Sequence, residues 1–68
     1  MKLIQYQALL ANPQNVAIVQ ARRQTIERIG GRLAIAPPTR VGMVVVILEL
    51  PVDYTPEHFF PDIPFYPV

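Results

Sequence analysis

The side chains that could take part in acid–base or metal chemistry gather in the last part of the chain. Asp53, Glu57, His58 and Asp62 are the one place where carboxylates and a histidine lie close in sequence. Carboxylate oxygens and imidazole nitrogens can bind metals or exchange protons. Prolines interrupt this stretch repeatedly, whereas a metal site needs ligands in a fixed geometry. We therefore expect no metal and no cofactor, and we expect His58 to be a capping or surface residue.

The chain lacks the nucleophiles that covalent catalysis uses most. It has no cysteine, no serine, and a single lysine and histidine. This composition excludes Ser-His and Cys-His triads, disulfides and thiolate metal sites. Gly30 and Gly31 follow a predicted helix, whereas a phosphate-binding loop has its glycines leading into one. The sequence therefore predicts a protein that is not an enzyme.

Charge is divided unevenly along the chain, although the net charge is only +1. All six basic residues lie in the first forty positions with one acid, which gives +5, and the four later acids make the remainder −4. The acidic part either folds over the basic helix or reaches another copy or a basic partner. Arg22 and Arg23 are candidate anion contacts. Because the aromatic residues lie away from the arginines, weak nucleic-acid binding through this helix is only a further alternative.

Local patterns predict the first half of the fold. Apolar and polar residues alternate over residues 3–10, as in a half-buried strand. Asn12 and Pro13 favour the start of a helix, with Asn15 as the alternative cap. The helix should run to about Ile29 with Arg22 in its apolar stripe. Gly30 should close this helix with a positive φ.

A hairpin should follow the helix, with strands at residues 32–36 and 43–50. The second of these strands is apolar on both faces, which is typical of a central or covered strand. A single helix covers only one face, so the other should be an apolar interaction site. The alternative is that the tail folds over this face and seals it. The expected interface residues are Met43, Val45, Ile47, Leu9, Phe59, Phe60, Phe65 and Tyr66.

The fold class expected from these elements is α+β, with an antiparallel sheet, one main helix and a proline-rich C-terminal tail. Residues 1–50 form the βαββ core and residues 51–68 the tail of the same domain, with a short helical turn after Thr55 and then an extended arm. With the tail counted, the order is a degenerate form of the ferredoxin-like βαββαβ pattern.

Size and composition also suggest where the protein works. A chain of 68 residues has a small core, so self-association as a homo-oligomer or a bound protein partner should supplement it. The first residues lack the pattern of a signal peptide, and the longest apolar run, residues 41–48, is far shorter than the roughly 20 residues that cross a bilayer. We expect a cytoplasmic protein that does not enter a membrane.

Three short segments carry a family resemblance. Ile26-Glu27-Arg28-Ile29-Gly30-Gly31-Arg32-Leu33, Leu48-Glu49-Leu50-Pro51 and Pro61-Asp62-Ile63 together resemble the subtilisin propeptide and its stand-alone protease-inhibitor relatives. The resemblance implies a sheet face that packs on a protease and a tail, residues 65–68, that lies in its substrate cleft. The leading hypothesis is a small protein-protein interaction or assembly module, and the alternative is a propeptide-like inhibitor or chaperone.

Overall fold

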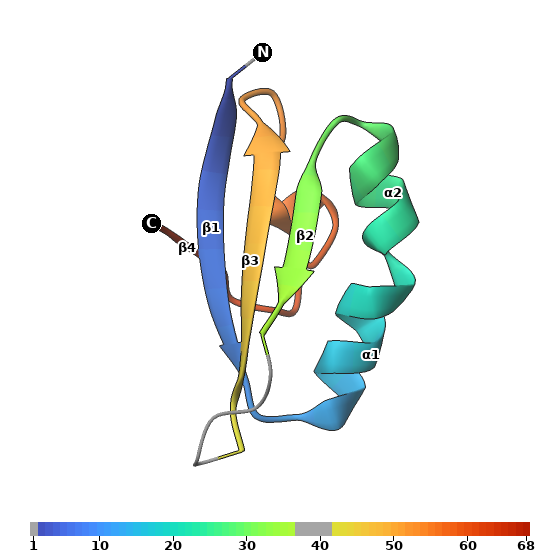
Figure 1. Ribbon diagram of the computed structural model, residues 1–68, viewed down its shortest axis with the longest axis vertical. Coiled ribbons are helices and arrows are strands. Elements are labelled where there is room, and N and C mark those ends of the chain that lie inside the picture. Colours follow the sequence, from blue (N-terminus) through green and yellow to red (C-terminus); the bar gives the residue numbers. More distant parts are fainter. Residues whose placement is uncertain (1, 37–41) are drawn as a thin grey trace.

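The protein is a small α+β fold with one four-stranded antiparallel sheet (Figure 1). The computed structural model describes residues 2–36 and 42–68. No helix within these ranges has the length and apolar character needed to cross a membrane. The elements are β1 (Leu3–Leu10), α1 (Pro13–Ala21), α2 (Arg23–Arg28), β2 (Arg32–Ile35), β3 (Val44–Pro51), the 3-10 helix η1 (Pro56–His58) and β4 (Tyr66–Pro67).

The strands are ordered β2-β3-β1-β4, and every neighbouring pair is antiparallel. β1 and β3 form the centre and pair along their whole length, from Leu3 opposite Pro51 to Leu10 opposite Val44. β2 occupies the edge beside β3, and β4 occupies the edge beside β1. The predicted first strand and the predicted hairpin are confirmed, apart from one-residue shifts at the ends of the hairpin strands.

Prolines set the length of β4. The amide of Val68 donates to the carbonyl of Gln5 at 3.0 Å, and Tyr66 lies opposite Gln7. Continuing this register places Pro64 opposite Leu9, where the ladder would again require an N–H on the β4 side. Proline has no N–H, so pairing begins only at Tyr66. The last segment is therefore a very short edge strand.

The helical segment is broken at Arg22, so the expectation of one continuous helix to about Ile29 is wrong. Arg22 has φ −99° and ψ 5°, and its amide donates to Val19 at 3.2 Å. In a continuous helix its side chain would stand between the fully buried Val19 and Ile26, where an unpaired charge is costly. The break leaves Arg22 exposed.

Both ends of the helical segment follow the sequence signals. The Asn12 side chain accepts a hydrogen bond from the amide of Gln14 at 2.9 Å, which is the predicted N-cap. Gly30 has φ 88° and closes α2, as predicted. Gly31 follows directly and is buried, because the end of α2 lies against β3 there.

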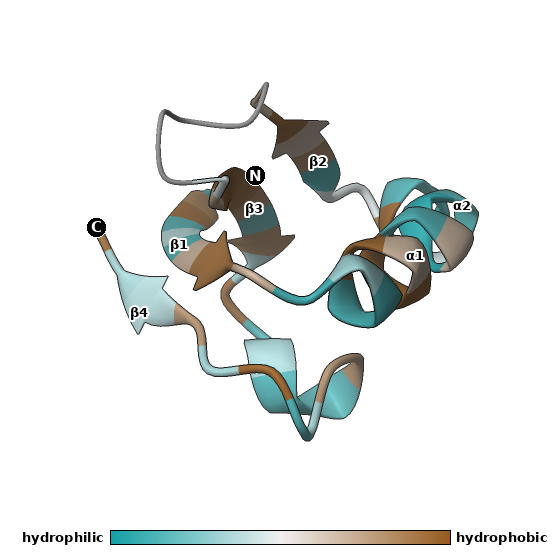
Figure 2. Ribbon diagram, turned by 90° about the horizontal axis from the view of Figure 1, so that it is seen from below, coloured by the Kyte–Doolittle hydropathy of each residue, from teal (hydrophilic) through white to brown (hydrophobic). Residues whose placement is uncertain are grey.

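The hydrophobic core lies between the sheet and a second layer made of the helices and the tail (Figure 2). Phe59 and Phe60 are 8% and 1% exposed, so the expectation that they belong to a partner interface is wrong. Packing two aromatic rings into the core removes more apolar surface from water than leaving them on the open face of the sheet would. The core residues are Ala8, Leu10, Val19, Ile26, Leu33, Val46, Leu48, Leu50, Phe59, Phe60 and Ile63.

Candidate functional site: the uncovered face of the sheet

One face of the sheet carries neither the helices nor the tail. Because side chains alternate along a strand, the residues between those of the core point to this other side. Figure 2 shows α1, α2 and the segment before β4 gathered on the core side. We call the opposite side the uncovered face; its members are Gln5, Gln7, Leu9, Arg32, Ala34, Val45, Ile47, Glu49 and Tyr66.

Strand register arranges these residues in three rows across the sheet. A charged row near one end joins Arg32, Glu49 and Gln5, with Glu49 opposite both of the others, and the apolar Leu3–Pro51 pair lies beyond it. The tyrosine row crosses all four strands as Ala34, Ile47, Gln7 and Tyr66. The leucine row contains Val45 and Leu9, and Pro64 continues it by register. The charged side chains of the uncovered face, Arg32 and Glu49, therefore lie near one end of it.

Exposure on this face is lowest in β3 and rises toward both edges of the sheet, where Ala34 in β2 and Tyr66 in β4 are exposed. Val45 and Ile47 in the central strand β3 are half-buried by their neighbours, as is Met43 just before β3. Leu9 is 54% exposed and Tyr66 is 65% exposed. Contiguous apolar side chains open to solvent are uncommon on a protein that acts alone. The face therefore has the character of a contact surface.

A groove crosses the uncovered face where β1 and β4 meet. It has a volume of about 440 Å³ and is lined by Gln7, Leu9, Pro64, Tyr66, Pro67 and Val68. Its walls are mostly apolar, and the side-chain amide of Gln7 is their one polar side-chain group apart from the Tyr66 hydroxyl. The groove could accept an apolar or aromatic side chain with one hydrogen-bonding group.

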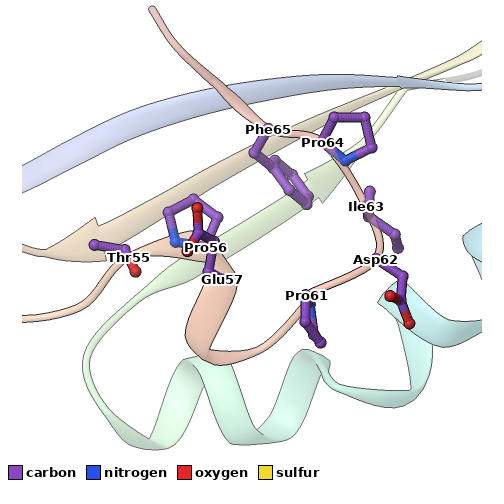
Figure 3. Close-up of a pocket in the computed structure, with 8 residues that line it drawn as sticks. All are labelled: Thr55, Pro56, Glu57, Pro61, Asp62, Ile63, Pro64 and Phe65. Carbon is purple, nitrogen blue, oxygen red and sulfur yellow. The ribbon is translucent and has the colours of Figure 1, made fainter.

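The acidic residues and histidine of the tail do not form a comparable site. A hollow of about 570 Å³ is lined by tail residues, and Figure 3 shows the carboxyl groups of Glu57 and Asp62 apart from each other in it. Within residues 2–36 and 42–68, no three His, Asp or Glu side chains are grouped so that they could hold a metal. His58 instead caps its turn: its Nδ1 accepts a hydrogen bond from the amide of Thr55 at 3.0 Å. The expectation of a capping histidine is confirmed.

The candidate residues from the sequence fall on different parts of the molecule. Val45, Ile47, Leu9 and Tyr66 lie together on the uncovered face. Phe65 is half-buried and packs against the core from the other side. The two candidate anion contacts, Arg22 and Arg23, do not lie on the uncovered face.

Arg22 and Arg23 are exposed at the junction of α1 and α2, on the helical side of the molecule. They are therefore separated by the sheet from the uncovered face (Figure 2). Their role as anion contacts stays a prediction.

Sequence reasoning missed the groove and the charged row. Both depend on which strands become neighbours, because Arg32 meets Glu49 and Tyr66 meets Gln7 only through pairing between distant segments. A local signal for the groove exists in Pro64, since a proline two residues before an edge strand stops the ladder and leaves Leu9 without a hydrogen-bonded neighbour on the β4 side.

No protein family, curated protein or solved structure matches this chain. The uncovered face is therefore the observation from which a function can be proposed.

Proposed function

We propose that this chain is a non-enzymatic protein-protein interaction module that binds its partner through the uncovered face. The observation that carries the proposal is the one-sided covering of a sheet whose central strand is apolar on both sides. Val45 and Ile47 alternate with the buried Val46 and Leu48, yet the helices and tail lie only over the latter pair. A protein partner on the open side would remove the remaining apolar surface from water.

The distribution of charge supports a protein partner. Interface centres are depleted in charged residues, and their rims are polar. On the uncovered face, Arg32 and Glu49 lie near one end, while the middle holds apolar side chains with the amide of Gln7. That amide can satisfy a polar group of the partner at the centre of the contact.

We also propose that the fold is a reduced ferredoxin-like arrangement. The order β2-β3-β1-β4, with all neighbours antiparallel, supports this proposal. In this view α1 and α2 together form the first crossover, and η1 with the loop around it takes the place of the second crossover helix.

Site-specific photo-cross-linking in the cells that make the protein tests the proposed function. A p-benzoylphenylalanine at Leu9 replaces a side chain that is already 54% exposed, so the fold should tolerate it. We expect a defined covalent adduct from this position. The matched control carries p-benzoylphenylalanine in place of Ile18, which is 43% exposed but lies on α1. The control should give no comparable adduct.

A second substitution shows whether the adduct depends on the apolar face. Val45→Glu places a carboxylate beside Leu9, its register partner, and should abolish the adduct while the far-ultraviolet circular dichroism stays unchanged. Equal adducts from Leu9 and Ile18, or an adduct that survives Val45→Glu, would contradict the proposal.

The alternative function is that of a subtilisin-propeptide-like inhibitor or chaperone. The open sheet face supports it, because that family packs such a face on its protease. Tyr66 and Pro67 are held in β4, so insertion of the tail into a protease cleft would require this strand to detach from β1. Inhibition of subtilisin, or acceleration of its refolding, by the intact chain and its loss on removing residues 66–68 would establish this alternative.

A further inference from the structure

We propose that the partner on the uncovered face is a second copy of this chain, related by a twofold axis that places each Tyr66 in the groove of the other copy. This inference rests on the proposed function, since it names the occupant of the same face.

A twofold interface requires one surface to be complementary to itself. The uncovered face carries both parts of such a contact: a projecting Tyr66, which is 65% exposed, and a groove of about 440 Å³ beside it. Leu9 and Pro64 form apolar walls for an aromatic ring, and the amide of Gln7 can bond to a phenolic hydroxyl. A tyrosine is therefore a chemically suitable occupant.

The order of the rows indicates where the axis lies. We place the twofold axis across the strands, midway between the tyrosine row and the leucine row. Rotation about this axis puts the tyrosine row of one copy over the leucine row of the other. Ile47 then faces the partner's Val45, and Tyr66 faces the partner's Leu9 and Pro64. The charged row falls outside the stacked centre on both copies, so Arg32 and Glu49 stay at the rim in water.

The face is large enough for such a dimer. Four strands about 4.8 Å apart, with about six residues of about 3.3 Å each, give a footprint of about 19 Å by 20 Å. Because side chains project from the sheet, the accessible area that each copy buries is larger than this flat footprint. It approaches the roughly 600–800 Å² per partner of small specific interfaces. A 68-residue chain with a small core also has more to gain from such burial than a large protein.

Sedimentation equilibrium of the purified chain over a wide concentration range tests the inference. We expect a transition from the 7.7 kDa monomer to a species of twice that mass. Tyr66→Ala should raise the dimer Kd at least tenfold, because an anchoring aromatic side chain contributes more than about 1.4 kcal/mol. The matched control is Ile18→Ala, an exposed apolar residue of α1, which should leave the Kd unchanged.

Engineered cysteines locate the axis, because the natural chain has none. One copy with Val45→Cys is mixed with a tagged copy with Ile47→Cys and treated with a short bis-maleimide. The proposed axis predicts that this mixed pair cross-links faster than a mixture of Val45→Cys with Leu9→Cys. An axis parallel to the strands would stack β3 on the partner's β1 and reverse that order.

Three results would overturn the inference: a monomer at every concentration, a dimer that Tyr66→Ala does not weaken, or the reversed cross-linking order. None of them contradicts the proposed function by itself. If the chain is monomeric but the Leu9 photo-adduct contains a different protein and is lost in Val45→Glu, the uncovered face remains an interaction surface with another occupant. If neither self-association nor a face-dependent adduct is found, both proposals fail.

Discussion

The two faces of the sheet are built from alternate residues of the same strands, yet they have opposite environments. On the core face, Val46 and Leu48 are completely buried under the helices and tail. On the uncovered face, Val45 and Ile47, their immediate neighbours in β3, are partly open to water. The side chains are alike in type, so hydrophobicity of the strand does not distinguish the faces. The difference is made by the helices and the tail, which within residues 2–36 and 42–68 cover one side of the sheet.

This difference teaches that an apolar residue in β3 can have either of two roles. Residues on the core face stabilise the monomer, because their burial is complete within one chain. Residues on the uncovered face are only partly buried in the monomer and so contribute less to its stability. Under the proposed function, their burial becomes complete only when a partner covers them. Paired substitutions, one on each face, separate the two roles.

Phe60→Ala should have the largest effect on stability. Phe60 comes from the tail but is only 1% exposed in the core, and removing such a ring costs about 3–5 kcal/mol. A chain this small has about that much stability in total, so the variant should be largely unfolded at 25 °C by circular dichroism and urea titration. The matched variant is Tyr66→Ala, an exposed tail aromatic, which should keep the monomer folded. An equal loss of unfolding free energy in the two variants would contradict the placement of Phe60 in the core and Tyr66 on the uncovered face.

Leu48→Ala and Ile47→Ala compare the two faces at adjacent positions of one strand. Leu48 is fully buried, and its truncation should lower the free energy of unfolding by about 3 kcal/mol. Ile47 is half-buried on the uncovered face, and its truncation should cost about 1 kcal/mol, mainly through strand propensity. Urea denaturation at a concentration where the protein is monomeric measures both. Similar losses would mean that the uncovered face is already buried within one chain.

Much of this arrangement could be predicted from local sequence patterns. The strand at residues 3–10, the Asn12 cap and the positive φ of Gly30 follow from signals within a few residues. Alternation within residues 43–50 also assigned each side chain to the correct one of two faces, because the period of a strand is two.

The side taken by the tail could not be predicted in the same way. Phe59 and Phe60 could bury themselves on either face of an apolar sheet, and in the structure they join Val19 and Ile26 in the core. The groove depends on the pairing of Tyr66 with a strand almost sixty residues earlier. Such contacts between distant segments leave no periodic signal, so the periodicity of the sequence could not predict them.

Gly31→Ala tests how closely the helical layer approaches the sheet on the covered side. A Cβ on Gly31 would lie 2.6 Å from the carbonyl oxygen of Glu49 and 2.9 Å from Cγ2 of Ile26. Backbone would have to move, and we expect a loss of about 2 kcal/mol in the free energy of unfolding. The control is Gly42→Ala, where a Cβ meets nothing within 4 Å and only the positive φ of 78° opposes it, at about 1 kcal/mol. A Gly31→Ala variant as stable as Gly42→Ala would indicate a looser contact.

His58→Leu should have the smallest effect, although it acts on the turn that carries Phe59 and Phe60 into the core. His58 Nδ1 accepts the Thr55 amide at 3.0 Å and lies 3.2 Å from the Thr55 hydroxyl. Leucine removes this acceptor at an exposed site where water can replace it, so the expected loss is about 0.5–1 kcal/mol, a fall in Tm of several degrees. His58→Gln keeps an acceptor suited to the third position of a capped turn and should retain more stability than His58→Leu. If thermal unfolding shows the two variants to be equally destabilised, this hydrogen bond does not stabilise the turn. Burial of Phe59 and Phe60 alone would then hold the tail on the core face.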